Sequence, residues 1–306
     1  MTQVFVRYRL GGLGLVMVAA VVVVAFLAPW LAPYDPYATI TGSSADIMAS
    51  PSRGHLLGQD DSGKDVLSSV IYGSRISLTV GFAASFIVVV LGATVGMLSG
   101  YAGGRVDMVL MRITDAFLVV PRLPLMLVVI TVAGRGLANI ILVIGLLSWT
   151  YMARVVRSQV LTVKERQFIL RAKALGVSPA RIMTRHILPQ VVPVIFAEAT
   201  LDVSYAILSE ATLSFLGLGD PMLISWGSIL NRAFLRGAVM REAWWYLIPP
   251  GVALAWTTLG LTFLGIALQE MINPRLKTHH LFDEGKTVAI KRLKTRTPIL
   301  GEAPRF

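Results

Sequence analysis

The chain has 306 residues, 55% of them apolar, and its mean hydropathy of +0.70 is higher than a soluble domain of this length would show. It contains no cysteine, which excludes disulfides and thiolate metal sites. A net charge of +11 would suggest nucleic acid as a partner if the charges covered a soluble surface, but the basic residues gather in a few connecting stretches. The apolar residues form blocks of about twenty, the length that crosses a bilayer. We therefore predict an all-α membrane protein with no nucleic-acid partner.

Six apolar blocks predict six transmembrane helices. The first follows a basic start with Arg7 and Arg9, and its apolar run is too long for a signal peptide, so we expect it to remain uncleaved. The third is the weakest, because charged residues and prolines interrupt it. In chain order, the predicted spans are Leu13–Leu31, Ile76–Ser99, Met108–Val132, Leu137–Ala153, Val191–Leu213 and Tyr246–Gln269.

Basic residues predict which side of the membrane each connection faces. They fall on one side if both termini are cytoplasmic, which leaves the acidic segment Pro33–Arg75 and the segment Phe215–Trp245 outside. We accordingly divide the chain into a first helix with a sizeable extracytoplasmic segment (1–75), a five-helix transmembrane domain (76–277) and a basic cytoplasmic tail (278–306).

The polar stretch 160–189, between the fourth and fifth spans, predicts two short cytoplasmic helices joined by a tight turn. Its first part has apolar residues at helical spacing, and a glycine then stops the helix. A serine follows as N-cap, a proline begins the second helix and another proline ends it. In this order the residues are Phe168, Ala172, Leu175, Gly176, Ser178, Pro179 and Pro189. Such an element between spans is typical of a docking site for another protein.

Ionisable residues inside the spans are the candidates for a transport path. Glu198 and Asp202 lie four residues apart on one face of the fifth span, and a buried carboxylate in a membrane is a functional hypothesis by default. They could line a path for a cationic or zwitterionic solute, or they could pair with basic residues of neighbouring helices. In the third span, Arg112 and Asp115 are spaced to pair with each other.

Three glycines of the second span, Gly92, Gly96 and Gly100, recur at intervals of four residues. This pattern allows another helix backbone to approach closely. The approaching helix could belong to a partner or to this chain, and we favour packing within the chain.

The segment from Gly58 to Lys64 has the G-x-x-x-x-G-K spacing of a phosphate-binding loop, but two observations argue against that function. Asp65 stands where a serine or threonine should meet magnesium, and Asp60 and Asp61 would repel phosphate. Catalytic and metal-binding motifs are absent from the sequence as well. We expect no cofactor or metal in this chain, and we do not expect it to be an enzyme.

Several sequence blocks together resemble one family. The block 171–176 (RAKALG), followed by 187–189 (ILP), is similar to the EAA loop of ABC importer permeases. Further blocks resemble the oligopeptide, dipeptide and nickel branch of these binding-protein-dependent inner-membrane components. They are HLLGQD at 55–60, IYGSRIS at 71–77, YAGGRVD at 101–107, LSFLGLG at 213–219, SWG at 225–227 and NPRL at 273–276.

The resemblance implies that the stretch 160–189 is the coupling loop that contacts an ATPase. The residues it assigns to this loop are Arg171, Ala172, Lys173, Ala174, Leu175, Gly176, Ser178, Pro179, Leu188 and Pro189. Two positions depart from the family, because Leu170 replaces the glutamate that gives the loop its name and Arg171 replaces the first alanine. These departures imply a different contact with the ATPase.

The resemblance also implies the partners and the function. They are a second permease subunit, two cytoplasmic ABC ATPases that bind ATP and magnesium, an extracytoplasmic solute-binding protein, and the lipid of the inner membrane. The chain would form half of the path for di- or oligopeptides, although nickel permeases share the pattern. The alternative is an ion-coupled secondary transporter without an ATPase, which predicts an internal repeat that the sequence does not show.

Overall fold

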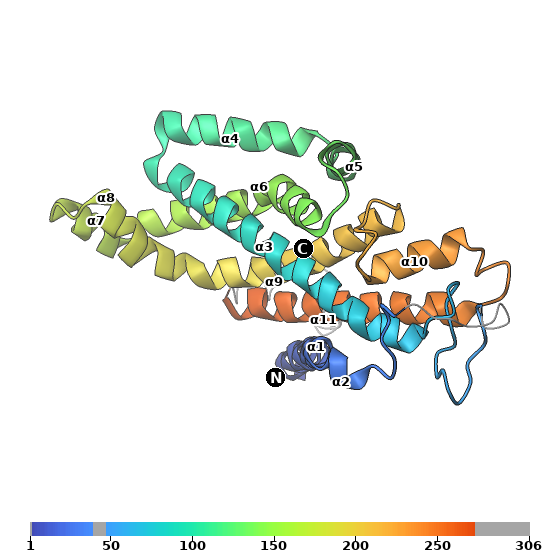
Figure 1. Ribbon diagram of the computed structural model, residues 1–306. Coiled ribbons are helices and arrows are strands. Elements are labelled where there is room, and N and C mark those ends of the chain that lie inside the picture. Colours follow the sequence, from blue (N-terminus) through green and yellow to red (C-terminus); the bar gives the residue numbers. More distant parts are fainter. Residues whose placement is uncertain (1, 39–46, 273–306) are drawn as a thin grey trace, which may run out of the picture. The chain divides into compact units, whose positions relative to one another are not determined.

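The structure, a computed structural model, describes residues 2–38 and 47–272, and this part of the chain is helical and contains no strand (Figure 1). The predicted basic tail, 278–306, lies outside the described residues. In chain order the helices are α1 (Thr2–Phe26), α2 (Ala28–Leu31), α3 (Val66–Ala102), α4 (Gly104–Val119), α5 (Arg122–Ala133), α6 (Leu137–Lys164), α7 (Gln167–Ala174), α8 (Pro179–Ile182), the π-helical turn η2 (Met183–Ile187), α9 (Leu188–Phe215), α10 (Trp226–Leu235) and α11 (Trp244–Ile272).

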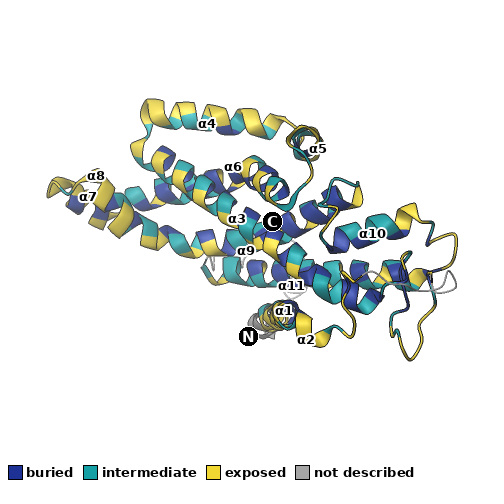
Figure 2. Ribbon diagram, in the orientation of Figure 1, coloured by how far each residue is buried: buried dark blue, intermediate teal, exposed yellow. Residues whose placement is uncertain are grey.

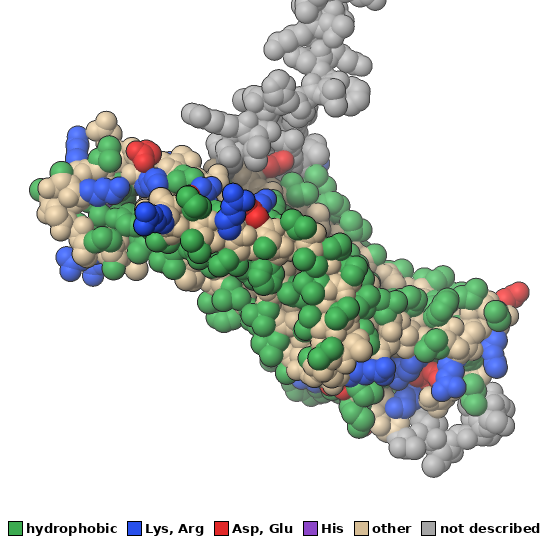
Figure 3. Space-filling model, turned by 90° about the horizontal axis from the view of Figure 1, so that it is seen from above, with side chains coloured by type: hydrophobic (Ala, Val, Ile, Leu, Met, Phe, Trp, Pro, Cys, Tyr) green, Lys and Arg blue, Asp and Glu red, His purple; other side chains and the backbone are tan. Residues whose placement is uncertain are grey.

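Among the described residues, five helical segments are long and apolar enough to cross a membrane, and there are six if the bent pair α4–α5 forms one span. The all-helical, multi-span prediction is therefore confirmed. In Figure 3, Lys and Arg side chains gather in two groups, and hydrophobic side chains cover the surface between them. This distribution is typical of a protein whose middle lies in lipid and whose ends reach water.

The third predicted span, Met108–Val132, was wrong as a single helix. α4 and α5 meet at 87°, because Pro121 removes a helical N–H donor and holds Val120 in an extended conformation (ψ 126°). Figure 1 shows the two helices turning sharply at this point.

The predicted pair of Arg112 with Asp115 was also wrong. Asp115 instead accepts a 2.6 Å hydrogen bond from Arg154 of α6. One turn further along α6, Arg157 binds Asp107 through Nε and Nη2, both at 2.6 Å. The charges of α4 thus join two helices, a use that spacing along one helix does not reveal.

The glycine series of α3 packs against α6 of the same chain. A Cβ atom on Gly92 would lie 2.6 Å from the Met152 Cβ, and one on Gly96 would lie 2.5 Å from the Ala153 carbonyl oxygen. At Gly100 it would lie 2.8 Å from the Val160 Cβ. Atoms do not tolerate distances this short, so no larger residue fits at these positions without a shift. The two helix backbones can lie this close because glycine has no side chain.

This packing predicts the effect of one methyl group. Gly96→Ala should destabilise the protein by about 1–3 kcal/mol, because the obstacle is a backbone oxygen that cannot move aside. The thermal midpoint of the detergent-solubilised protein would measure the loss. Gly251→Ala in α11 is the matched control, since a Cβ there has no atom within 4 Å. An equal midpoint for both variants would contradict the packing argument.

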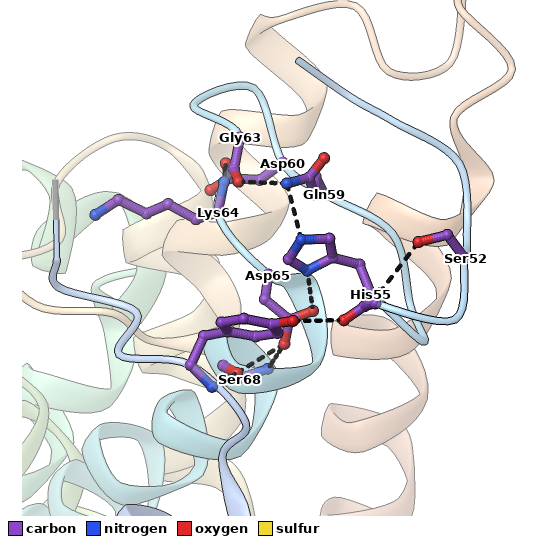
Figure 4. Close-up of polar contacts among 10 residues, drawn as sticks. Ser52, His55, Gln59, Asp60, Gly63, Lys64, Asp65 and Ser68 are labelled. Carbon is purple, nitrogen blue, oxygen red and sulfur yellow. Dashed lines mark hydrogen bonds and ion pairs between the residues drawn. The ribbon is translucent and has the colours of Figure 1, made fainter. Parts of the chain in front are cut away.

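The segment before α3 is held by a network of polar side chains (Figure 4). His55 Nδ1 lies 3.1 Å from Asp65 Oδ1, and Gln59 Nε2 lies 3.1 Å from His55 Nε2. Asp65 is also the N-cap of α3, where Oδ2 accepts a 2.8 Å bond from the Ser68 amide. The network therefore fixes the start of α3 to the segment that precedes it.

The G-x-x-x-x-G-K loop is engaged by its own side chains. The Asp60 carboxylate accepts the amides of Ser62 and Lys64, each at 2.8 Å, and so occupies the donors that a phosphate would need. Lys64 Nζ donates to the Pro36 carbonyl at 2.9 Å. Burial of its carboxyl raises the pKa of Asp60 above the ordinary value. This geometry agrees with the rejection of a phosphate site.

Candidate coupling surface and transport path

The helices α7 and α8 project from one end of the long helices, away from α10 and the segment 47–65 (Figure 1). Their inner side chains form one apolar cluster with α6 and η2, whose buried members include Val163, Ile169, Ala172, Ile182 and Ile187. Figure 2 shows much of the outer surface of α7 and α8 as exposed. The loop therefore has a packed base and a free outer face.

The predicted apolar face of α7 was only partly right. Ala172 is buried as expected, but Phe168 is 42% exposed and Leu175 is 83% exposed. The inward positions are Ile169 and Ala172, which have the same helical spacing of three residues. Spacing alone could not choose between the two faces, because both carry apolar residues.

The turn after α7 contains Gly176, the glycine that the sequence predicts as a helix stop. Gly176 has a φ of +74°, a conformation that favours glycine, and its amide donates to the Lys173 carbonyl at 3.0 Å. Pro179 is the first residue of α8, as predicted. Ser178 precedes it in an extended conformation, but its side chain makes no capping hydrogen bond, so the N-cap prediction was wrong in that respect.

The predicted end at Pro189 was also wrong. The helix that begins at Pro179 continues through η2 into α9, forming one helical segment from Pro179 to Phe215. Pro189 stands in the first turn of α9, where a missing N–H does not break the helix, and η2 absorbs the change in hydrogen bonding. The loop is thus directly continuous with the helix that carries Glu198 and Asp202.

The outer face of the loop combines positive charge with apolar side chains. Arg171, Lys173, Ala174 and Leu175 are exposed, and Leu170, which stands where the family has glutamate, is exposed as well. Lys173 Nζ lies 5.5 Å from the centre of the Tyr101 ring. A mixed surface of this kind suits contact with another protein.

The two carboxylates of α9 lie inside the bundle in different surroundings. Glu198 is buried and accepts a 2.9 Å hydrogen bond from Gln269 of α11. The Oδ2 atom of Asp202 is also buried, and within the described part of the chain it has no hydrogen-bond partner. The charged groups that act on Asp202 are Glu198 and Arg122 of α5. Both sequence alternatives therefore stay open, because a positive charge lies near the acids without forming a hydrogen-bonded pair.

Three further residues of this region, Arg122, Tyr151 and Tyr205, were not predicted as site residues from the sequence. Arg122 lies 5.8 Å from the centre of the Tyr205 ring, and Tyr151 interacts electrostatically with both carboxylates. The helices α5, α6 and α9 contribute one or more of these residues each. No signal within a single helix could have grouped them.

A third acid of α9, Glu210, has a different environment. Its side chain is 1% exposed, and it accepts hydrogen bonds from Ser77 of α3 at 3.2 Å and Ser214 at 2.7 Å. The Ser77 hydroxyl in turn accepts a 3.4 Å hydrogen bond from the amide of Trp226, the first residue of α10. Glu210 therefore joins α3, α9 and α10, and its satisfied hydrogen bonds indicate a structural role.

Apolar spans, a projecting loop continuous with a span, and polar side chains inside the bundle define the class as a multi-pass membrane protein. Comparison with known proteins specifies this class further. Residues 92–278 match the family described as binding-protein-dependent transport system inner membrane component. Residues 1–51 match the N-terminal TM domain of oligopeptide transport permease C.

Individual relatives agree over most of the chain. It is 34% identical to the dipeptide transport system permease protein DppC of Alkalihalophilus pseudofirmus, over 89% of this chain and 88% of the relative. It is also 34% identical to the oligopeptide transport system permease protein OppC of Bacillus subtilis, over 88% and 87%. The nickel transport system permease protein NikC of Escherichia coli is 34% identical over 88% and 95%.

The chain therefore belongs to the family of binding-protein-dependent transport system inner membrane components. It is a permease subunit of an ABC importer and a multi-pass protein of the inner membrane.

Proposed function

We propose that this permease forms half of a translocation path for di- or oligopeptides and couples ATP hydrolysis in partner subunits to alternating access. The observation that carries this proposal is the continuous helical segment from the coupling loop at Pro179 to the polar residues of α9. A displacement of the loop would move the helix that bears Glu198 and Asp202, because a helix transmits motion along its axis as a rigid element.

The loop is the proposed contact with the ATPases. The outer face of 160–189 meets one of the two ABC ATPase subunits. These subunits hold the ATP and magnesium, so this chain itself needs no cofactor and catalyses no hydrolysis. Both termini are then cytoplasmic. The segments 33–75 and 215–245 meet the solute-binding protein, and a second permease completes the path.

The proposed division of the chain follows from this arrangement. Residues 1–75 anchor the extracytoplasmic segment, 76–277 form the transmembrane domain with its loop, and 278–306 form a cytoplasmic tail. Peptides are the proposed solute because side chains of both charge signs, Arg122 and Asp202, lie close enough to interact.

Uptake by the assembled complex in proteoliposomes tests the proposal. With ATP inside and the loaded binding protein outside, we expect uptake of a labelled dipeptide and none of nickel. Uptake of nickel alone would contradict the peptide assignment. Uptake that follows an ion gradient and does not need ATP would favour the secondary transporter instead.

A further inference from the structure

One exposed face of the bundle carries polar residues at positions where a surface against lipid would be apolar. Tyr151 of α6 is 52% exposed and Tyr205 of α9 is 37% exposed, and apolar side chains such as Leu146 and Leu208 are exposed on the same two helices. The ionisable side chains beside these tyrosines are Arg122, Glu198 and Asp202, and ionisable residues within membrane helices mark solute pathways. This face is therefore a candidate for the wall of the path.

A positive charge stands at the edge of this face. Arg122 is the first residue of α5, where the chain turns by 87° from α4. Its Nη2 donates to Thr150 at 3.5 Å, a long bond, and the guanidinium lies over Tyr205. A guanidinium has five N–H donors, and the described residues engage only this one in a hydrogen bond.

The opposite charge is also incompletely bonded. Asp202 interacts electrostatically with Arg122, yet its buried Oδ2 has no hydrogen-bond partner among the described residues. Glu198, one helical turn before it, adds a second carboxylate. A buried ion pair gains stability only when its geometry is good and its remaining polar atoms are bonded.

A structural ion pair of the same chain shows the difference. Arg157 and Asp107 form two hydrogen bonds of 2.6 Å, so both carboxylate oxygens of Asp107 accept from the guanidinium. Arg122 and Asp202 carry the same two functional groups without a hydrogen bond between them. The N–H donors of Arg122 and the Oδ2 acceptor of Asp202 can therefore bind a ligand that carries both a negative and a positive group.

We propose that Arg122 determines specificity for the carboxylate of a zwitterionic solute, while Asp202 and Glu198 bind its ammonium group. This inference rests on the proposed function, because a free dipeptide carries one group of each kind. Transport then requires both termini of the peptide to be charged, in addition to whatever selection the binding protein makes.

The test compares uptake of a free dipeptide with uptake of a carboxylate-free analogue, the amide or methyl ester that the binding protein delivers. Uptake is measured for the wild type and for Arg122→Gln in the complete complex with saturating loaded binding protein. The same binding protein serves both complexes, so its own preference cancels when the two acid-to-analogue ratios are compared. Loss of charge-assisted hydrogen bonds should lower the ratio by about tenfold in the variant.

Two further variants sharpen the result. Asp202→Asn should leave this ratio unchanged and instead lower the preference for a free dipeptide over its N-acetyl form. Arg154→Gln removes an arginine of α6 that pairs with Asp115, and both ratios should match the wild type.

An unchanged acid-to-analogue ratio in Arg122→Gln would overturn the inference, even if total uptake falls, because a structural role weakens both substrates equally. Failure of the proposed function looks different. In that case the wild-type complex itself would not take up the dipeptide.

Discussion

Ala172→Arg should reduce ATP-driven uptake to background while the protein still inserts in the membrane. Ala172 is buried in the cluster that joins α7 to α6 and η2. An unpaired arginine there would cost about 3–5 kcal/mol. The variant would avoid this cost by releasing α7 from its base, and the ATPases would then act on a loop that no longer moves α9.

Gly176→Pro should produce the same loss by a different route. Proline holds φ near −65°, whereas Gly176 has a φ of +74°, and proline lacks the N–H that donates to Lys173. One variant adds a charge and the other changes the turn. If both abolish uptake, the loss is due to the displaced loop, because this is the change that they share.

Three measurements are needed for these variants: uptake, the amount of protein in the membrane, and the ATPase subunits that copurify. Ala102→Arg is the matched control, because Ala102 is an exposed residue at the end of α3, outside the loop. Wild-type uptake by either loop variant, with normal ATPase copurification, would exclude this loop as the coupling element.

Glu210→Ala should destabilise the protein strongly and prevent recovery of a folded complex. The substitution leaves the hydroxyl groups of Ser77 and Ser214 buried without their acceptor and adds a cavity. Each buried hydroxyl left without its acceptor costs about 1–3 kcal/mol, so with the cavity the total exceeds most single substitutions. The contact of α10 with α3 should also weaken. Ser77 accepts the amide of Trp226 at 3.4 Å, and without Glu210 the Ser77 hydroxyl is no longer held in position.

Size-exclusion elution and the thermal midpoint in detergent would measure this effect. Glu210→Gln keeps the volume and one acceptor oxygen, so its loss should be smaller. Glu165→Ala removes an exposed carboxylate and should leave the midpoint unchanged. A midpoint for Glu210→Ala close to that of Glu165→Ala would contradict the structural role of this buried acid.

The structure refines the sequence predictions mainly where one element meets another. Gly176 could be predicted as a helix stop because its backbone conformation is a local property. The pairing of Asp115 could not be predicted in the same way, because Arg154 lies on another helix and Arg112 was the only candidate at helical spacing. Similarly, the inward face of α7 depended on the apolar surface beneath it, and two faces of this short helix were apolar enough to fill that place.

The sequence by itself determined the helical class, the positions of most spans, the two short helices between the fourth and fifth spans, and the family. These properties are encoded locally, because a helix in a bilayer satisfies its backbone hydrogen bonds within its own segment and needs only apolar length. Only the tertiary structure decided that the third span bends, that α8 continues into α9, and that Arg122 lies among residues of three helices. A proline can either bend a helix, as Pro121 does, or stand in its first turn, as Pro189 does, and the sequence does not say which. The group around Arg122 depends on contacts between residues far apart in the chain, about which spacing along a single helix carries no information.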